Sequence, residues 1–135
     1  MFLLDTNVVS ELRRPRPHGG VVAWLRSIPE ASLHISAVTL GEIQRGIEIT
    51  RGRDAVKARE IELWADKLER TFAVVPADGA IFRRHARTMR GRPDAAYEDA
   101  LIAATASVLD LTLATRNVAD FQGFEIRVFD PFRTA

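Results

Sequence analysis

The 135-residue sequence contains no cysteine, which excludes disulfide bonds, thiolate zinc sites and a cysteine nucleophile. Its three histidines, His18, His34 and His85, lie in separate contexts without an adjacent nucleophile, so a serine-type triad is not expected. A glycine-rich phosphate-binding loop is also missing, because Gly19-Gly20 is an isolated pair. Any catalytic site must therefore be built from other side chains.

Long apolar runs are absent as well. The most apolar stretch, residues 100–109, includes Thr105 and Ser107 and falls far short of the roughly 20 residues that span a bilayer. The N-terminus reaches Asp5 without a basic segment, unlike a signal peptide. With 47% hydrophobic and 27% charged residues, the composition predicts one cytoplasmic domain over residues 1–135, with no membrane segment.

Lysine is scarce among the 19 basic residues, and the net charge is only +1. The overall charge therefore does not predict a polyanionic partner. Arginines do cluster within residues 83–92, and guanidinium groups bind phosphate through paired hydrogen bonds. This cluster predicts either a solvated surface or an RNA contact through Arg84 and Arg87.

Short apolar runs alternate with helical patterns along the chain. Strands are expected at residues 2–4, 33–35, 73–75, 111–114 and 126–128, and helices at 6–12, 21–28, after Ser36, about 55–72, 79–89 and 97–109. This alternation predicts an α/β fold with a mostly parallel sheet of four or five strands, covered by helices in three layers. Open parallel sheets bind ligands at the carboxyl ends of their strands.

Five acidic residues follow strands or begin the next helix, and these are Asp5, Glu42, Asp78, Asp99 and Asp120. We interpret Asp78 as a helix cap and expect the other four to converge on one pocket. Gathered carboxylates raise one another's pKa unless a cation lies among them. Oxygen ligands without cysteine favour Mg²⁺ or Mn²⁺, which can activate water for attack on a phosphodiester.

Four segments, in this order, resemble the PIN-domain nucleases, and specifically the VapC- and FitB-like toxins of bacterial type II toxin–antitoxin pairs. They are residues 4–7 with 10–15, residues 36–43, residues 98–106, and residues 113–117 with 118–121. Residues 95–98 depart from the Gly- or Pro-containing turn of many relatives, which bears on the local shape of the pocket.

The resemblance implies that Asp5, Glu42 and Asp99 are catalytic metal ligands and that Asp120 is a fourth acid acting through metal-bound water. Hydrogen-bond donors that orient these groups are then Thr6, Asn7, Thr115 and Asn117. Helix capping explains Thr6 and Asn7 equally well. Glu11 also lies in a family-like segment, and we interpret it as an exposed helix acid.

The resemblance also implies an activity and partners. The activity is that of an Mg²⁺-dependent endoribonuclease toxin, with Mn²⁺ able to substitute. The partners are RNA, a cognate antitoxin, and a second copy in a homodimer or a hetero-oligomer with the antitoxin. Operator DNA would be bound only through the antitoxin.

Three other functions remain open. One is a housekeeping RNA- or DNA-processing nuclease of the same fold, and another is a PIN-like RNA-binding module that does not cleave. The third is a phosphoacceptor receiver domain, which needs an acceptor aspartate directly after its third strand and a lysine after its fifth. Here Pro76 precedes Asp78, and Lys57 and Lys67 lie in the long middle helix.

Overall fold

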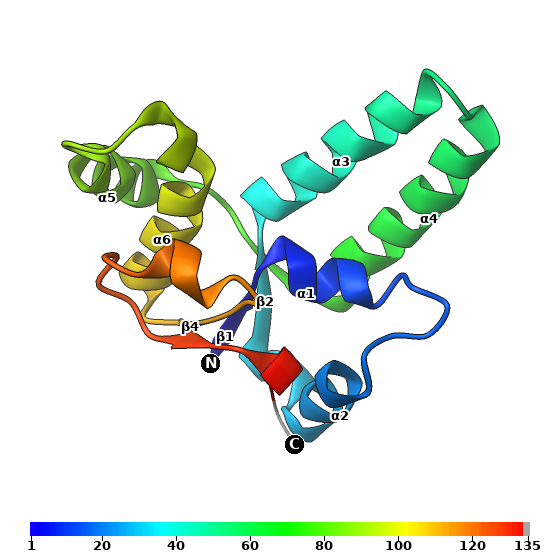
Figure 1. Cartoon of the computed structure of the whole chain (residues 1–135), viewed down its shortest axis with the longest axis horizontal. Coiled ribbons are helices and arrows are strands. Elements are labelled where there is room, and N and C mark those ends of the chain that lie inside the picture. The colour runs from blue at the N-terminus through cyan, green and yellow to red at the C-terminus, as the bar shows by residue number, and fades with distance from the viewer. Residues whose placement is uncertain (134–135) are drawn as a thin grey trace.

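The computed structural model describes residues 1–133, and its core is a parallel β-sheet (Figure 1). The strands lie in the order β3-β2-β1-β4-β5, and every neighbouring pair is parallel. They are β1 (Phe2–Leu4), β2 (Leu33–Ser36), β3 (Ala73–Val75), β4 (Thr112–Ala114) and β5 (Val128–Phe129). The prediction of an α/β fold with a parallel sheet is confirmed.

Helices cover both faces of this sheet (Figure 1). One face carries α5 (Gly79–Met89) and α6 (Tyr97–Leu109), and the other carries α1 (Thr6–Glu11), α2 (Gly19–Ser27), α3 (Ala37–Arg51) and α4 (Ala55–Thr71). Short 3₁₀ helices span Glu30–Ser32, Asp94–Ala96, Val118–Phe121 and Pro131–Arg133. Within residues 1–133, no helix combines the length and apolar character needed to cross a membrane.

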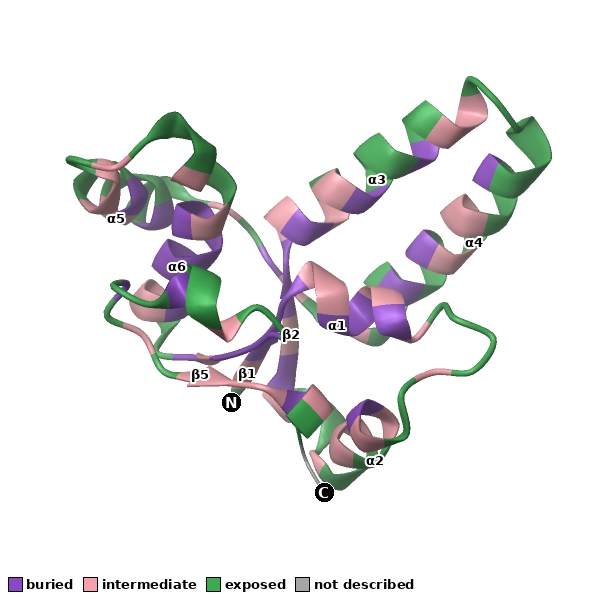
Figure 2. Ribbon diagram, viewed as in Figure 1, coloured by how far each residue is buried: buried purple, intermediate pink, exposed green. Residues whose placement is uncertain are grey.

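The central strands β1 and β4 contribute to two hydrophobic cores, which appear as buried ribbon in Figure 2. Leu3 packs into the core beside α5 and α6, whereas Leu4 packs into the core beside α1 to α4. In β4, Leu113 packs into the core beside α5 and α6, and Ala114 packs into the core beside α1 to α4. Successive strand residues point to opposite faces, so three residues suffice to join both layers.

Two elements begin two residues away from their predicted positions. The helix expected at 21–28 spans 19–27, because His18 Nδ1 accepts the Gly20 and Val21 backbone N–H groups at 3.1 and 3.4 Å and caps it earlier. The last strand was expected at 126–128 and spans 128–129, since a turn closed by Ile126 N–H on the Phe124 carbonyl delays it.

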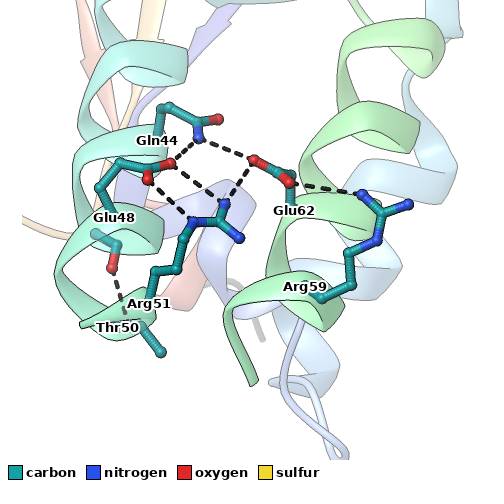
Figure 3. A network of polar contacts seen from close by, with 7 residues as sticks. Gln44, Glu48, Thr50, Arg51, Arg59 and Glu62 are labelled. Carbon is teal, nitrogen blue, oxygen red and sulfur yellow. Dashed lines mark hydrogen bonds and ion pairs between the residues drawn. The ribbon is translucent and has the colours of Figure 1, made fainter. Parts of the chain in front are cut away.

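The long helices α3 and α4 form a hairpin that extends away from the sheet (Figure 1). Ile43 and Ile47 of α3 are buried in the same core as Ala58 and Ala65 of α4. On the polar side, Figure 3 shows Glu62 of α4 linked to Arg51 of α3 at 2.9 Å. The hairpin is therefore held by apolar packing on one side and by the Arg51–Glu62 ion pair and a Gln44–Glu62 hydrogen bond on the other.

Candidate functional site

The strand order places a topological switch point at the carboxyl ends of β1 and β4. The chain builds β1, β2 and β3 in one direction and then returns to place β4 on the other side of β1. Ligands bind at such a switch point in open parallel sheets. Asp5 follows β1 and Thr115 follows β4, and both lie there. Receiver domains have the order 2-1-3-4-5 instead, so that alternative is wrong.

Asp5 is the most enclosed acid of the site, with 9% of its surface exposed. Its Oδ1 accepts the Thr6 backbone N–H at 2.8 Å, and its Oδ2 accepts the Thr115 hydroxyl at 2.8 Å and the Asn7 amide at 3.3 Å. Burial raises the pKa of Asp5, the three hydrogen bonds oppose this, and the charge of Asp120 adds to the increase. The carboxylate is thus held in one orientation.

The Thr115 hydroxyl is the centre of this network. It donates its proton to Asp5 and accepts the Asn7 side-chain N–H at 3.1 Å and the Asn117 backbone N–H at 3.0 Å. Asn7 Oδ1 in turn accepts the Arg116 backbone N–H at 3.0 Å. Asn7 therefore joins the ends of β1 and β4, whereas the contact made by Asn117 comes from its backbone.

Glu42 enters from the second turn of α3 and is half-buried. Thr6 Oγ1 lies 3.2 Å from Glu42 Oε2 and 3.3 Å from Thr39 Oγ1, which is fully buried. Burial is the main cause that raises the pKa of Glu42 to about 7, followed by the charge of Glu98 and, less strongly, those of Asp5 and Asp99. Glu42 is therefore in the electrostatic field of the other acids.

Asp99 completes the site from the first turn of α6. Burial raises the pKa of Asp99, and the charges of Asp5, Asp120 and Glu98 raise it further. Asp120 is exposed and lies in the 3₁₀ helix after β4, where its charge acts on both Asp5 and Asp99. The structure thus brings together all four predicted acids.

The pKa values of Asp5, Glu42 and Asp99 are raised, as expected, but the expected cause was incomplete. The prediction named mutual repulsion as the cause, whereas burial is the largest contribution for Asp5, Glu42 and Asp99. Two participants, Thr39 and Glu98, were not predicted as site residues. Their only signals were positional, since Thr39 precedes Glu42 by one helical turn and Glu98 adjoins Asp99.

The donor set is made of oxygen atoms, which suits a hard divalent cation. In the part of the chain from 1 to 133, no three His, Asp or Glu side chains are already close enough together to hold one ion jointly. Mg²⁺ usually retains several waters and is bound through one or two carboxylates, so it does not require such a cage. The site therefore fits a hydrated Mg²⁺ or Mn²⁺ ion better than a tetrahedral zinc ion.

Two further predictions concern acids outside this cluster. Asp78 caps α5, because its Oδ1 accepts the Ile81 backbone N–H at 3.0 Å, as expected. The expectation that Glu11 is an exposed helix acid is wrong. Glu11 is buried, and its Oε2 accepts the His18 backbone N–H at 2.9 Å, because the proline-containing loop folds back over α1. Glu11 thus fixes the connection between α1 and α2.

The two arginines proposed as RNA contacts lie on α5. Arg84 is half-buried, and its Nη1 donates to the Ser107 hydroxyl of α6. Arg87 is exposed. The Arg84 guanidinium thus contributes to the packing of the two helices, which leaves part of its hydrogen-bonding capacity for a ligand.

Comparison with known proteins identifies the family. Residues 2–122 match the PIN domain model. The chain is 35% identical to Toxin FitB of Neisseria gonorrhoeae, covering 98% of this chain and 99% of FitB, and 30% identical to the VapC ribonuclease Y4jK of Sinorhizobium fredii over the full length of both.

Solved structures agree with this match. The FitAcB crystal structure from Neisseria gonorrhoeae superimposes with a TM-score of 0.86 at 32% identity and covers 99% of this chain and 100% of that chain. The structure of FitAB bound to a DNA fragment gives a TM-score of 0.76 at 30% identity, covering 100% of this chain and 98% of that chain. The chain therefore belongs to the PIN-domain family, in the group that includes FitB and the VapC ribonucleases.

Proposed function

We propose that this protein is a metal-dependent endoribonuclease that acts as the toxin of a type II toxin–antitoxin pair. The observation that carries the proposal is the group of four acids at the β1–β4 switch point, three of which have raised pKa values. Whole-length similarity to a protein named a toxin and to one named a ribonuclease favours this function over a housekeeping nuclease.

The reaction adds water across a P–O bond of the RNA backbone. Ribonucleases of this family depend in general on divalent metal ions, and we propose Mg²⁺, with Mn²⁺ able to substitute. Asp5, Glu42, Asp99 and Asp120 would hold the ion. When bound, it would supply Lewis acidity and neutralise charge on the phosphate.

The side chains around these acids position them for that reaction. Thr115 and Asn7 keep Asp5 Oδ2 in a fixed orientation, and Thr6 holds Glu42 Oε2. Glu42 has a pKa of about 7 in the protein without a cation and is therefore partly protonated near neutral pH. Cation binding requires its carboxylate form, so Glu42 would release a proton on binding.

The proposed partners follow from the same relatives. A cognate antitoxin would hold the protein inactive and bind operator DNA, as the FitAB complex with DNA suggests by analogy. We further propose a homodimer or a hetero-oligomer with the antitoxin, a single PIN domain over residues 1–135, and action on RNA in the cytoplasm. Arg84 and Arg87 are proposed as outer contacts to the RNA backbone.

The test is cleavage of a mixed RNA pool by the purified protein in Mg²⁺, Mn²⁺ or excess chelator, with mapping of the product ends. Cleavage in either metal and none in chelator is expected. Asp5→Asn serves as the inactive control against a contaminating nuclease. RNA binding without new ends would favour the non-cleaving alternative, and full activity in chelator would overturn the metal-dependent mechanism.

A further inference from the structure

A cavity of about 520 Å³ adjoins Asp120, on the β4 side of the candidate site. The 3₁₀ helix after β4 and the C-terminal segment form its walls, and its polar lining consists of Arg116, Asn117, Asp120, Gln122, Asp130 and Arg133. This cavity, here called the Arg116 pocket, shares Asp120 with the candidate site. Its volume lies within the range of roughly 300 to 1,000 Å³ that is typical of small-ligand pockets.

Two contacts position Arg116 at this pocket. Its guanidinium carbon lies 4.7 Å from the centre of the Phe132 ring, and its backbone N–H is bound by Asn7, which also contacts Asp5. Within the described part of the chain, Arg116 forms no ion pair. A guanidinium that stacks on a ring and keeps its N–H groups free can bind a phosphate through paired hydrogen bonds.

Two other arginines show why Arg116 is distinctive. Arg92 also lies over a ring, that of Phe124, but it donates to two backbone carbonyls and therefore ties loops together. Arg133 lines the Arg116 pocket, yet Asp130 lies 3.6 Å from it and offsets its charge. Arg116 is thus the cation of the pocket that remains available to an anionic ligand.

The other lining groups narrow the class of ligand. Asp120, which we propose as a metal ligand, and Asp130 oppose a bare anion, and the Asp130 carboxylate can accept a hydrogen bond from the amino group of a base. The amides of Asn117 and Gln122 can both donate to and accept from a base edge. A phosphate joined to a base satisfies this combination, whereas inorganic phosphate or an acidic peptide does not.

We propose that the Arg116 pocket binds a nucleotide next to the scissile phosphodiester of single-stranded RNA, with Arg116 contacting its phosphate and the amides contacting its base. This inference rests on the proposed ribonuclease function for the identity of the substrate. The RNA would then contact the protein on the β4 side of the acids, in a region separate from the proposed contacts of Arg84 and Arg87 on α5.

The test measures RNA binding separately from cleavage. Anisotropy of a fluorescein-labelled mixed-sequence single-stranded RNA, recorded in chelator over a series of salt concentrations, gives affinity and salt slope. We expect Arg116→Gln to weaken binding about tenfold and to reduce the magnitude of the slope of log affinity against log salt by about 0.7, as for one lost phosphate contact. The matched control is Arg70→Gln, which removes an exposed charge just before β3, at the opposite edge of the sheet, and should leave both values unchanged.

A second variant, Gln122→Ala, removes a base contact without changing charge and should weaken binding while leaving the salt slope unaltered. In active protein, Arg116→Gln should raise KM and change kcat less than about twofold. If Arg116→Gln binds RNA with the affinity and salt slope of the wild type, the Arg116 pocket is not an RNA site. The proposal would also be overturned if Arg116→Gln bound an acidic peptide more weakly than the wild type does while its RNA binding was unaltered. Absence of cleavage by the wild type would instead count against the proposed function, because the binding measurement does not depend on cleavage.

Discussion

Neutralising Glu42 should stabilise the metal-free protein at pH 8. Its pKa rises from an ordinary value of 4.5 to about 7, so the folded state binds more protons than the unfolded state between these two values. Stability therefore falls as pH increases through this window, and the full penalty applies above pH 7. A shift of this size corresponds to about 3 kcal/mol at most, and because the side chain is only half-buried, solvent screening reduces it to about 1–2 kcal/mol.

Glu42→Gln removes this penalty and retains an oxygen that can accept the Thr6 hydroxyl. In excess chelator at pH 8, we expect its Tm to exceed that of the wild type by about 3–8 °C. At pH 4.5 the difference should vanish, because folded wild-type protein is then protonated at Glu42. Saturating Mn²⁺ should reverse the order at pH 8, since the wild type gains more from cation binding.

Glu48→Gln, on the same helix, is the matched control. Arg51 and Gln44 hydrogen-bond to the exposed Glu48 side chain and lower its pKa, so its neutralisation should not stabilise the protein at pH 8 (Figure 3). Thermal melts monitored by circular dichroism at both pH values give the comparison. A Glu42→Gln protein that melts below the wild type by the same amount at both pH values would refute the electrostatic reasoning.

Three other substitutions test separate parts of the site. Asp99→Asn should reduce the rate of RNA cleavage at least about a hundredfold, whereas Asp78→Asn should change it little because Asn caps helices about as well as Asp. Thr115→Val leaves two N–H groups and Asp5 without their partner, so chemical denaturation should show a loss of about 1–3 kcal/mol, together with reduced cleavage. Thr39→Val should weaken Mn²⁺ binding measured by calorimetry, and Thr39→Ser should restore it, since only the hydroxyl reaches Thr6.

Much of the fold could be predicted because local and global signals coincide in this sequence. Ser36 and Asp78 cap helices where apolar periodicity also begins, so α3 and α5 were located by two independent cues. The positions of the site acids could also be predicted, because the carboxyl ends of parallel strands meet at one edge of the sheet. Residues such as Asp5 could therefore be placed from their position relative to strands alone.

The features that were missed depend on contacts between distant segments. Glu11 has the sequence surroundings of a surface helix acid, and its burial follows from a loop that returns to present the His18 N–H. Thr39 becomes part of the site only because Thr6, 33 residues earlier, lies against it. Periodicity and capping describe neighbours along the chain, so neither signal could reveal these contacts.

The gathered acids of the site lower the stability of the metal-free protein. The sheet topology determines where these acids lie. β1 lies in the middle of the sheet, so the acid at its end is buried and its pKa rises before any other charge is considered. Glu42 and Asp99 reach the same edge from α3 and α6, and each acquires a raised pKa. A cation at a hundred times its Kd would return about 2.7 kcal/mol to the folded state. This fold gathers carboxylates at a buried strand end, which lowers the stability of the metal-free protein. Metal binding should offset that loss of stability.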